Sequence, residues 1–475
     1  MPPTLALLLT TCFVVFLFWR DLRERPRVTR ALWIPLLWML ITESRSVSQW
    51  LGFWGTYNSP ADLADGSPLD RLVFLSLEVV GLLVLVRRRV SWSTLLSRNV
   101  WLMIFLAYCG LSIVWSDFPF VALKRWIKSL GLPLMFMILA TEPDPREALV
   151  RLIKRSAYVL VPFSILLIKY YPSLGREFSP WSGAAMNTGV TTNKNELGYV
   201  CLILGLLLFW HFVTTLRREK TPKRRKELFL TAGFLCMICW LLYMANSATS
   251  LMSLAVGVSI VMFLGLSFVN RRHTVSYLIA ALVTLSYAEL AFGVTDTLIA
   301  YLGRDSGLSG RVELWNELRS MVISPIIGAG FESFWLGTRA ELLWAHHWWR
   351  PNQAHNGYLE TYLNLGWIGV MLLLAWIASA FAKARATLLS DFDFGRLQLA
   401  VIATVLVYNY TEGALKGLHP LLFLLYIVAM EYPRARSSSA GNASRPGAET
   451  RPSRRTQAHK SSIAWRNHRL EPSEP

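Results

Sequence analysis

The chain has 475 residues, of which 53% are hydrophobic and 16% are charged, and its mean hydropathy is +0.39. A soluble chain of this length would show two or three domains of mixed patterning, so the composition excludes that class. The formal net charge is +18. The basic residues gather between apolar segments rather than on a soluble module, which argues against nucleic acid as a partner.

Apolar segments recur along almost the whole chain. Lipid offers the backbone no hydrogen-bond partners, so spanning segments must be helices or strands of a closed barrel. The runs are too long and alternate too little for barrel strands. The sequence therefore predicts an all-α, polytopic membrane helical bundle of about 12–13 transmembrane helices. The expected spans are 4–19, 31–43, 71–86, 99–115, 129–141, 156–171, 196–214, 228–244, 250–269, 275–293, 358–382, 397–410 and 419–432.

The charge distribution predicts the topology. Basic clusters such as Arg217–Lys226 and Lys383–Arg385 fall on one side of these spans. That side is cytoplasmic by the positive-inside rule, and its cations would contact anionic membrane lipids. The loops 44–70, 172–195 and 294–357 are then outside. The first segment has no basic region before it and no clear cleavage site, so we expect a retained span rather than a signal peptide.

Composition divides the chain into a polytopic membrane domain, 1–432, and a tail, 433–475. The tail is rich in Ser, Arg, Pro and Gly, and we expect a disordered, basic cytoplasmic segment because it cannot bury enough apolar surface to fold. No internal repeat is visible, which weakens an inverted-repeat transporter interpretation. All five cysteines lie in apolar segments, so no disulfide framework is implied.

The large outer loop, 294–357, is the polar stretch that carries the candidate site. Ser309-Gly310-Arg311 opens a short helix whose apolar residues recur at three- and four-residue steps. We expect this helix to lie in the membrane interface with Trp315 at head-group depth. The helix dipole disfavours a cation in the first turn, so Arg311 should have a ligand or a carboxylate partner.

His355 stands before Asn356-Gly357, where the chain is expected to re-enter the membrane. An imidazole can take a proton from a hydroxyl near neutral pH, which makes His355 a candidate base. The alternative is a structural interfacial histidine. His346 and His347 add no HxH or HExxH spacing, so the sequence predicts no metal site.

Three cations on the outer side could hold an anion. Arg311 can bind phosphate oxygens in a bidentate manner. Lys194 and Arg125 also lie at outer junctions, where the alternative role is contact with lipid head groups. No phosphate-binding glycine loop occurs, so the energy for a reaction would have to arrive with the substrate, as in a lipid diphosphate sugar.

Several motifs together resemble the O-antigen ligase/polymerase superfamily, which includes bacterial O-antigen ligases and polymerases of the exopolysaccharide type. Their order and spacing match over residues 70–430. They are Asn193-Lys194-Asn195-Glu196-Leu197-Gly198, Ser309-Gly310-Arg311 with Trp315, Pro325-Ile326-Ile327-Gly328-Ala329-Gly330-Phe331, and Ala354-His355-Asn356-Gly357-Tyr358-Leu359-Glu360 with Gly366-Trp367-Ile368-Gly369.

The resemblance implies a GT-C-like glycosyltransferase of the bacterial inner membrane, with its active face in the periplasm and neither metal nor cofactor. Its donor would be a glycan on undecaprenyl diphosphate. His355 would act on the acceptor hydroxyl, and Arg311 would hold the diphosphate. Lys194 and Arg125 would assist, with Asn356 and Trp315 as further substrate-binding residues.

The motifs do not fix the acceptor. A polymerase would use another lipid-linked repeat and a ligase would use lipid A-core. The segment Lys124–Lys128 and the chain length look closer to the exopolysaccharide polymerases, which we favour. Two other classes stay open: a non-enzymatic flippase or exporter of lipid-linked glycans, and a scaffold that binds envelope polysaccharide assembly proteins.

Overall fold

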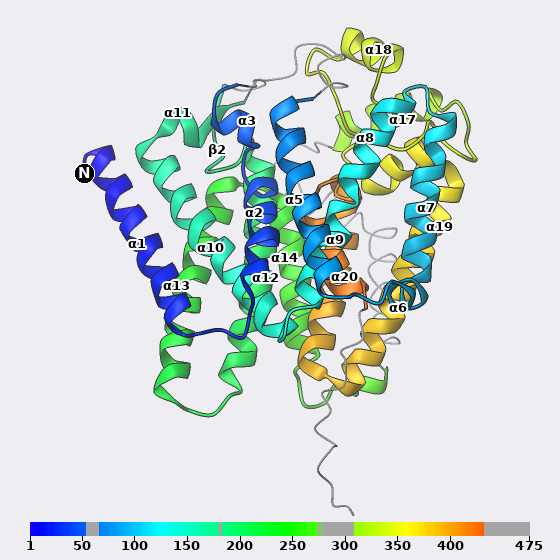
Figure 1. Cartoon of the computed structure of the whole chain (residues 1–475). Helices are drawn as coiled ribbons and strands as arrows, with labels where there is room; N and C mark the ends of the chain where they lie inside the picture. The colour runs from blue at the N-terminus through cyan, green and yellow to red at the C-terminus, as the bar shows by residue number, and fades with distance from the viewer. Residues whose placement is uncertain (54–65, 180–182, 274–276, 278–307, 432–475) are drawn as a thin grey trace, which may run out of the picture. The chain divides into compact units, whose positions relative to one another are not determined.

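The computed structural model describes residues 1–53, 66–179, 183–273, 277 and 308–431, and this part of the chain is almost entirely helical (Figure 1). The elements are α1 (Pro3–Arg23), η1 (Arg30–Leu32), α2 (Trp33–Thr42), α3 (Val47–Trp50), α5 (Pro68–Arg87), α6 (Trp92–Arg98), α7 (Val100–Leu111), η2 (Ser112–Trp115), α8 (Pro119–Ser129), α9 (Gly131–Ala140), α10 (Pro145–Tyr170), α11 (Pro172–Gly175), β1 (Arg176–Phe178), β2 (Ala185–Asn187), α12 (Lys194–Leu216), α13 (Pro222–Ala245), α14 (Ala248–Phe263), η3 (Arg271–His273), α17 (Leu308–Ser320), α18 (Thr338–His346), α19 (Gly357–Ser390), α20 (Phe392–Thr411) and α21 (Pro420–Ala429). The two strands pair antiparallel, with Arg176 opposite Asn187.

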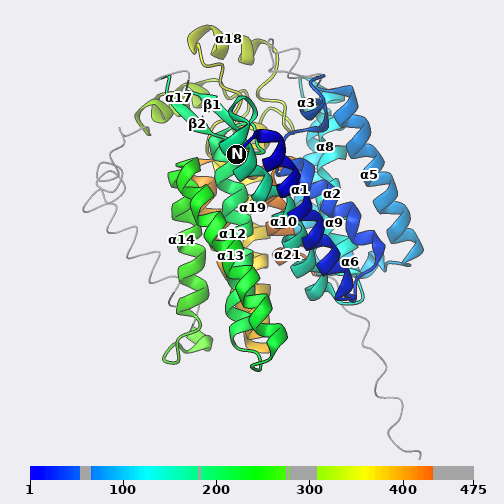
Figure 2. The same ribbon diagram turned by 90° about the vertical axis from the view of Figure 1, so that its left-hand side faces the viewer.

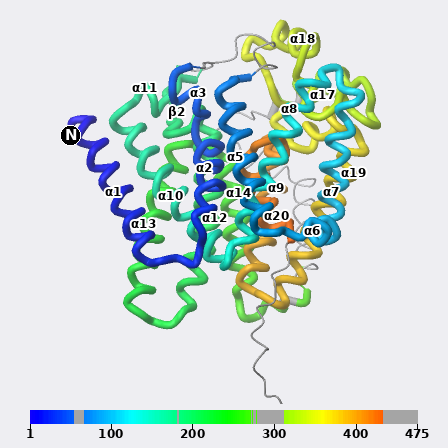
Figure 3. The backbone as a smooth tube through the Cα atoms, viewed as in Figure 1, coloured from blue at the N-terminus to red at the C-terminus, as the bar shows by residue number. Residues whose placement is uncertain are grey.

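The all-α, polytopic class is confirmed. Each expected span except one coincides with a helix, and the span expected at 275–293 lies almost wholly outside the described residues. By length and apolar composition, four of the described helices can cross a membrane: α1, α12, α13 and α19. A fifth candidate joins α6 to Val100–Trp115 through a bend of 97°, which Figure 3 traces.

Length and apolar composition give four or five membrane-crossing helices among the described residues, fewer than the expected 12–13 spans. Helix length explains much of the difference. α2, α9 and α21 each have 10 residues. At 1.5 Å per residue such a helix is about 15 Å long, half of the roughly 30 Å hydrocarbon core. The sequence shows an apolar run but not how much of it is one straight helix.

Long helices form the core of the described bundle. α12 packs against α13 and α14, α14 packs against α20, and α20 packs against α19. Figure 2 shows α12, α13 and α14 side by side. α12 has 23 residues and is therefore about 34 Å long, enough to separate two faces of a membrane. Lys194 begins this helix, and Arg217 caps its far end.

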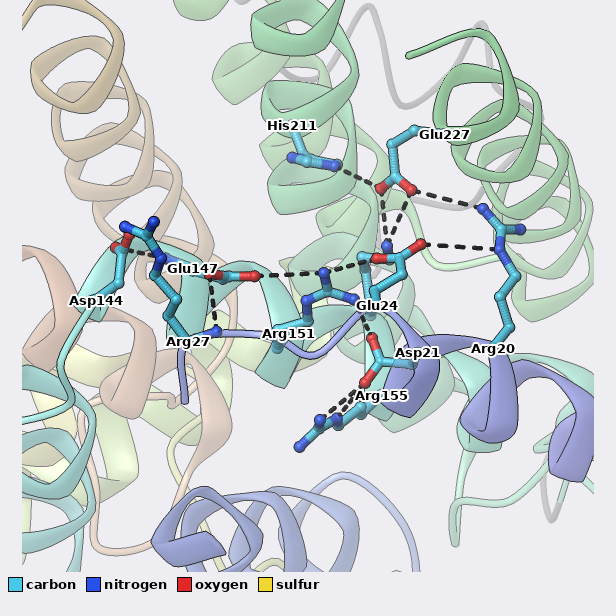
Figure 4. Close-up of polar contacts among 11 residues, drawn as sticks. Arg20, Asp21, Glu24, Arg27, Asp144, Glu147, Arg151, Arg155, His211 and Glu227 are labelled. Atoms are coloured by element: carbon cyan, nitrogen blue, oxygen red, sulfur yellow. Dashed lines mark hydrogen bonds and ion pairs between the residues drawn. The ribbon is translucent and has the colours of Figure 1, made fainter. Parts of the chain in front are cut away.

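Buried ion pairs fix α1 against α10 near the end of α12 that Arg217 caps. Asp21 lies between Arg151 and Arg155 of α10 (Figure 4). Glu227 of α13 accepts from Lys154 at 2.8 Å and contacts His211 of α12 at 2.9 Å. Several of the basic residues that indicate topology are thus paired with acids rather than free for lipid.

The chain separates into two units, Met1–Pro433 and Arg434–Pro475. The second lies outside the described residues, so the disordered basic tail stays a prediction.

Candidate functional site

A break in α19 receives part of the large loop. Gly366 has φ 63° and ψ −166°, which interrupts the helix. Backbone hydrogen bonds join the loop segment Pro325–Gly330 to both sides of this break: Ala329 N to Leu363 O, Gly330 N to Asn364 O, Trp367 N to Pro325 O and Ile368 N to Ile326 O. The break exposes backbone groups that an unbroken helix would satisfy internally, and the loop satisfies them instead.

Glycine is required at this junction. Gly328 and Gly366 both have positive φ, a region that residues with a Cβ rarely adopt. A Cβ on Gly366 would lie 2.3 Å from the backbone of Ile326, and one on Gly328 would lie 2.5 Å from the backbone of Asn364. The two glycine-bearing motifs, far apart in sequence, therefore form one joint between loop and helix.

A small apolar core lies beneath this loop. Leu314 and Leu318 of α17 pack with Phe334, Trp335 and Leu343, and Trp315 packs at its border. The indole N–H of Trp315 donates to the carbonyl of Ala354 at 2.8 Å. Trp315 therefore supports the residue that precedes His355.

Glu360, in the first turn of α19, organises the same segment. Its Oε2 accepts from the backbone N–H of Ala354 at 3.0 Å, and its Oε1 accepts from the indole of Trp335 at 2.6 Å. Asn364 donates to Oε1 at 3.2 Å. A buried carboxylate with three donors is a rigid support, because each lost bond would leave a buried polar group unsatisfied.

His355 lies in a strained turn before α19. Its φ is +50°, a conformation that non-glycine residues rarely adopt and that clusters at functional sites. Asn356, next in the chain, caps α19 by accepting from the N–H groups of Tyr358 and Leu359, each at 3.0 Å. The structure thus gives Asn356 a helix-capping role beside the predicted substrate-binding role.

Glu412 brings the candidate residues together. Its Oε2 lies 2.9 Å from Nδ1 of His355, and its Oε1 lies 3.1 Å from Nη2 of Arg311. Arg311 also donates to the carbonyl of Thr411. Asn195 donates to Oε1 at 3.3 Å. We call Asn195, Arg311, His355 and Glu412 the His–Glu–Arg cluster. The carboxylate partner expected for Arg311 is confirmed.

The cluster holds Glu412 ionised. Burial raises the pKa of Glu412, but the hydrogen bond with His355 and the positive charge of Arg311 outweigh it, so the pKa lies below its ordinary value. The Glu412 side chain is 9% exposed, against 24% for His355 and 27% for Arg311. The imidazole and the guanidinium are therefore more accessible than the carboxylate between them.

The hydrogen bond with Glu412 indicates the tautomer of His355. Lys416 donates to Oε1 of Gln353 at 2.6 Å, and the amide nitrogen of Gln353 lies 3.4 Å from Nδ1 of His355. Both of these nitrogens are donors when Nδ1 is protonated, so the hydrogen bond that sets the tautomer is the shorter one to Glu412, at 2.9 Å. Against an ionised Glu412, Nδ1 is the protonated nitrogen. Among the described residues no hydrogen-bond partner reaches Nε2, so its lone pair is available to a proton donor.

Lys194 adjoins the cluster in sequence, whereas Arg125 contacts a different part of the large loop. Lys194 is the first residue of α12 and precedes Asn195 of the cluster. Arg125 of α8 donates to the carbonyl of Glu332. Glu332 in turn lies close to the segment that carries Lys416. A Cβ on Gly417, the residue after Lys416, would lie 2.6 Å from the Glu332 side chain.

The adjacent histidines share a carboxylate. Nδ1 of His346 and Nε2 of His347 lie 2.9 and 2.7 Å from the two oxygens of Glu317. In the described part of the chain no group of three or more His, Cys, Asp or Glu side chains could hold a metal ion.

Sequence reasoning missed Glu412, Asn195 and Gln353. One signal was available for Glu412: it is an acid just beyond an expected span end, on the outer side, where a cation had no partner. Nothing in the sequence indicated that Arg311 and His355 would share it.

The fold and the cluster define an all-α, multi-pass membrane protein whose large loop returns to the bundle at a histidine–glutamate–arginine site. The model of the O-antigen ligase family matches residues 232–374, a range that includes Arg311 and His355. The chain is also 28% identical over 361 residues to the exopolysaccharide production protein ExoQ of Rhizobium meliloti (strain 1021), covering 72% of this chain and 79% of that protein. These matches confirm the resemblance to the O-antigen ligase/polymerase superfamily and support an enzyme of the membrane glycosyltransferase type.

Proposed function

We propose that this protein transfers a glycan from undecaprenyl diphosphate to a sugar hydroxyl at the periplasmic face of the inner membrane, polymerising exopolysaccharide or O-antigen repeat units. The observation that carries the proposal is the His–Glu–Arg cluster at the return of the loop to α19. It joins an imidazole whose Nε2 has no hydrogen-bond partner among the described residues to a guanidinium, the two groups that displacement of a diphosphate requires.

The base is His355. Its Nε2 takes the proton of the acceptor hydroxyl while that oxygen forms a bond to the anomeric carbon of the donor. Glu412, hydrogen-bonded at Nδ1, fixes the tautomer and stabilises the imidazolium that forms, as a carboxylate does in a hydrolase triad. The imidazolium then releases this proton to solvent before the next transfer.

The leaving group is the lipid diphosphate. As the bond from the anomeric carbon to the phosphate oxygen breaks, its electron pair goes to the diphosphate, and Arg311 stabilises the added charge. A guanidinium has five N–H donors, and in this structure two nitrogens contact Thr411 and Glu412. Lys194 and Arg125 are the further cations that we assign to the diphosphate.

The reaction so described needs no metal. An alkyl diphosphate is already a good leaving group when cations balance its charge, and the cluster supplies both cation and base. We therefore expect catalysis to persist in a chelator.

Polymerase is the preferred activity. The similarity to a protein named for exopolysaccharide production supports it over most of the chain. O-antigen ligase, with lipid A-core as acceptor, is the second candidate, supported by the name of the family that matches 232–374.

The testing experiment uses the purified full chain in detergent with a lipid diphosphate repeat unit. We compare the parent with His355→Ala and Arg311→Ala, and use His346→Ala as the matched control because that side chain is 63% exposed and contacts Glu317 instead. We expect chain growth in the parent and the control, unaffected by chelator, and loss of about 10²-fold or more in both site variants.

Other results would redirect the proposal. Transfer to lipid A-core without chain growth would make this a ligase. Full activity of both site variants would remove the cluster from the chemistry. Absence of transfer in the parent, together with movement of the lipid-linked glycan across liposomes, would support a flippase.

A further inference from the structure

A second cationic cluster lies at the opposite end of α12 and α20 from Glu412. Arg396, in the first turns of α20, is fully buried, and Arg217 caps the far end of α12. α20 has 20 residues, so about 30 Å of helix rise separates its two ends. The two clusters are therefore on opposite faces of the bundle.

One carboxylate serves both guanidinium groups. Oδ1 of Asp393 lies 2.8 Å from Nη2 of Arg396 and 3.5 Å from Nη1 of Arg217. Both guanidinium groups also face the ring of Phe392, with centroid distances of 5.3 and 5.6 Å. Two positive charges thus share one negative charge.

Arg396 has nitrogen atoms left without partners. Among the described residues, Nε and Nη1 of Arg396 make no hydrogen bond, although the side chain is 0% exposed. A buried, incompletely paired charge is costly, by several kcal/mol in typical cases. A ligand that completes the pairing would remove this cost.

Nη2 of Arg217 and Nη1 of Arg396 approach the same point beside Gly265, just after α14. The position that a Cβ of Gly265 would take is 3.0 Å from Nη2 of Arg217 and 3.6 Å from Nη1 of Arg396. The carbonyl oxygen of Met262 lies 3.1 Å from the same position. Because this oxygen would repel an anion, a bound anion would lie nearer to the two guanidinium groups. The Arg217 side chain is 44% exposed, so one of the two guanidinium groups reaches the surface while Arg396 is buried behind it.

We propose that Arg217 and Arg396 bind a phosphate group at this face, as a site separate from the His–Glu–Arg cluster. Two convergent guanidinium groups match the oxygens of a phosphate in geometry and charge. The head-group phosphate of an anionic lipid and free inorganic phosphate share this chemistry. Basic pockets between helices at a membrane surface are typical sites for anionic lipid head groups.

The test is thermal unfolding of the full chain in neutral detergent with phosphatidylglycerol, phosphatidylcholine or inorganic phosphate added. A ligand that binds the folded state raises the unfolding temperature. We expect phosphatidylglycerol to raise it more than phosphatidylcholine. A comparable rise with inorganic phosphate would assign the site to a soluble phosphate instead.

Variants separate this site from general charge attraction. Arg217→Gln removes one guanidinium, and Gly265→Ala fills the space between the two without changing charge. Arg218→Gln is the matched control, because it removes the same charge from an exposed neighbour. We expect the ligand-dependent rise to be lost in Arg217→Gln, reduced in Gly265→Ala and kept in Arg218→Gln. An equal rise in all variants, or no rise with either phosphate ligand, would overturn the proposal.

Discussion

Nδ1 of His355 and Oε2 of Glu412 lie 2.9 Å apart although 57 residues separate them in the chain. The contact exists because α19 and α20 pack together, with His355 just before the first helix and Glu412 just after the second. The chemistry that we propose for His355 therefore depends on a residue outside the loop that carries it.

Replacing Glu412 should affect the acid–base step before it affects substrate binding. Glu412→Gln keeps the size of the side chain but removes the charge that stabilises a protonated His355. We expect kcat to fall about 10²-fold or more with a smaller change in KM. The measurement is steady-state transfer as a function of pH. Glu412→Asp, which keeps the charge, should retain more activity than Gln, and equal activity of parent and Gln variant would contradict the role.

The stability of the folded chain should depend on pH through the same carboxyl group. An unfolded glutamate has a pKa of about 4.3, and the folded Glu412 has a pKa below its ordinary value. Its stabilising contribution is then present above about pH 4.3 and lost as the pH falls through the folded pKa. The unfolding temperature of the parent should exceed that of Glu412→Gln at pH 7, and the difference should shrink toward pH 3. A constant difference would contradict this linkage.

The sequence predicts the helices well because apolar length is a local property. Twelve of the thirteen expected spans coincide with described helices. Their lengths and bends were not predictable, because α19 is broken at Gly366 by a loop segment about 40 residues upstream in sequence.

The charged residues Arg311 and His355 of the site could be predicted from the sequence, but their contacts with Glu412 could not. Because the helix dipole disfavours a cation in the first turn, the position of Arg311 predicts a ligand or a carboxylate partner. In the structure this partner is Glu412, 101 residues away in sequence. A contact over such a separation is set by tertiary packing and leaves no periodic pattern in the sequence. The capping role of Asn356 could have been read locally, since asparagine before a helix commonly accepts from its first N–H groups.

Gly357 tests how tightly the first turn of α19 fits. A Cβ at this position would lie 2.1 Å from Oδ1 of Asn409, which accepts from the N–H of Ala414 at 2.8 Å. We expect Gly357→Ala to destabilise the chain by about 1–3 kcal/mol through overpacking, and to lower transfer. The measurement is thermal unfolding with activity in parallel. Gly233→Ala is the control, because nothing lies within 4 Å of its Cβ, and helix propensity should make it neutral or stabilising by up to about 1 kcal/mol. Equal effects of the two would contradict the close fit.

Asp21 should be the most sensitive acid at the other face. Both Nε and Nη2 of Arg155 lie 2.8 Å from Oδ2 of Asp21, and the Arg155 side chain is 2% exposed. Asp21→Asn would leave that guanidinium buried without its counter-charge, at an expected cost of about 3–5 kcal/mol. Glu24→Gln is the matched control: Glu24 contacts Arg151 at 2.7 Å but is 20% exposed, and a pair that partly faces water contributes about 1 kcal/mol or less. Thermal unfolding of the purified variants checks this order. Because the pairing lies at the far end of α12 from His355, Asp21→Asn should lower the yield and stability of folded protein while the molecules that fold keep their transfer rate.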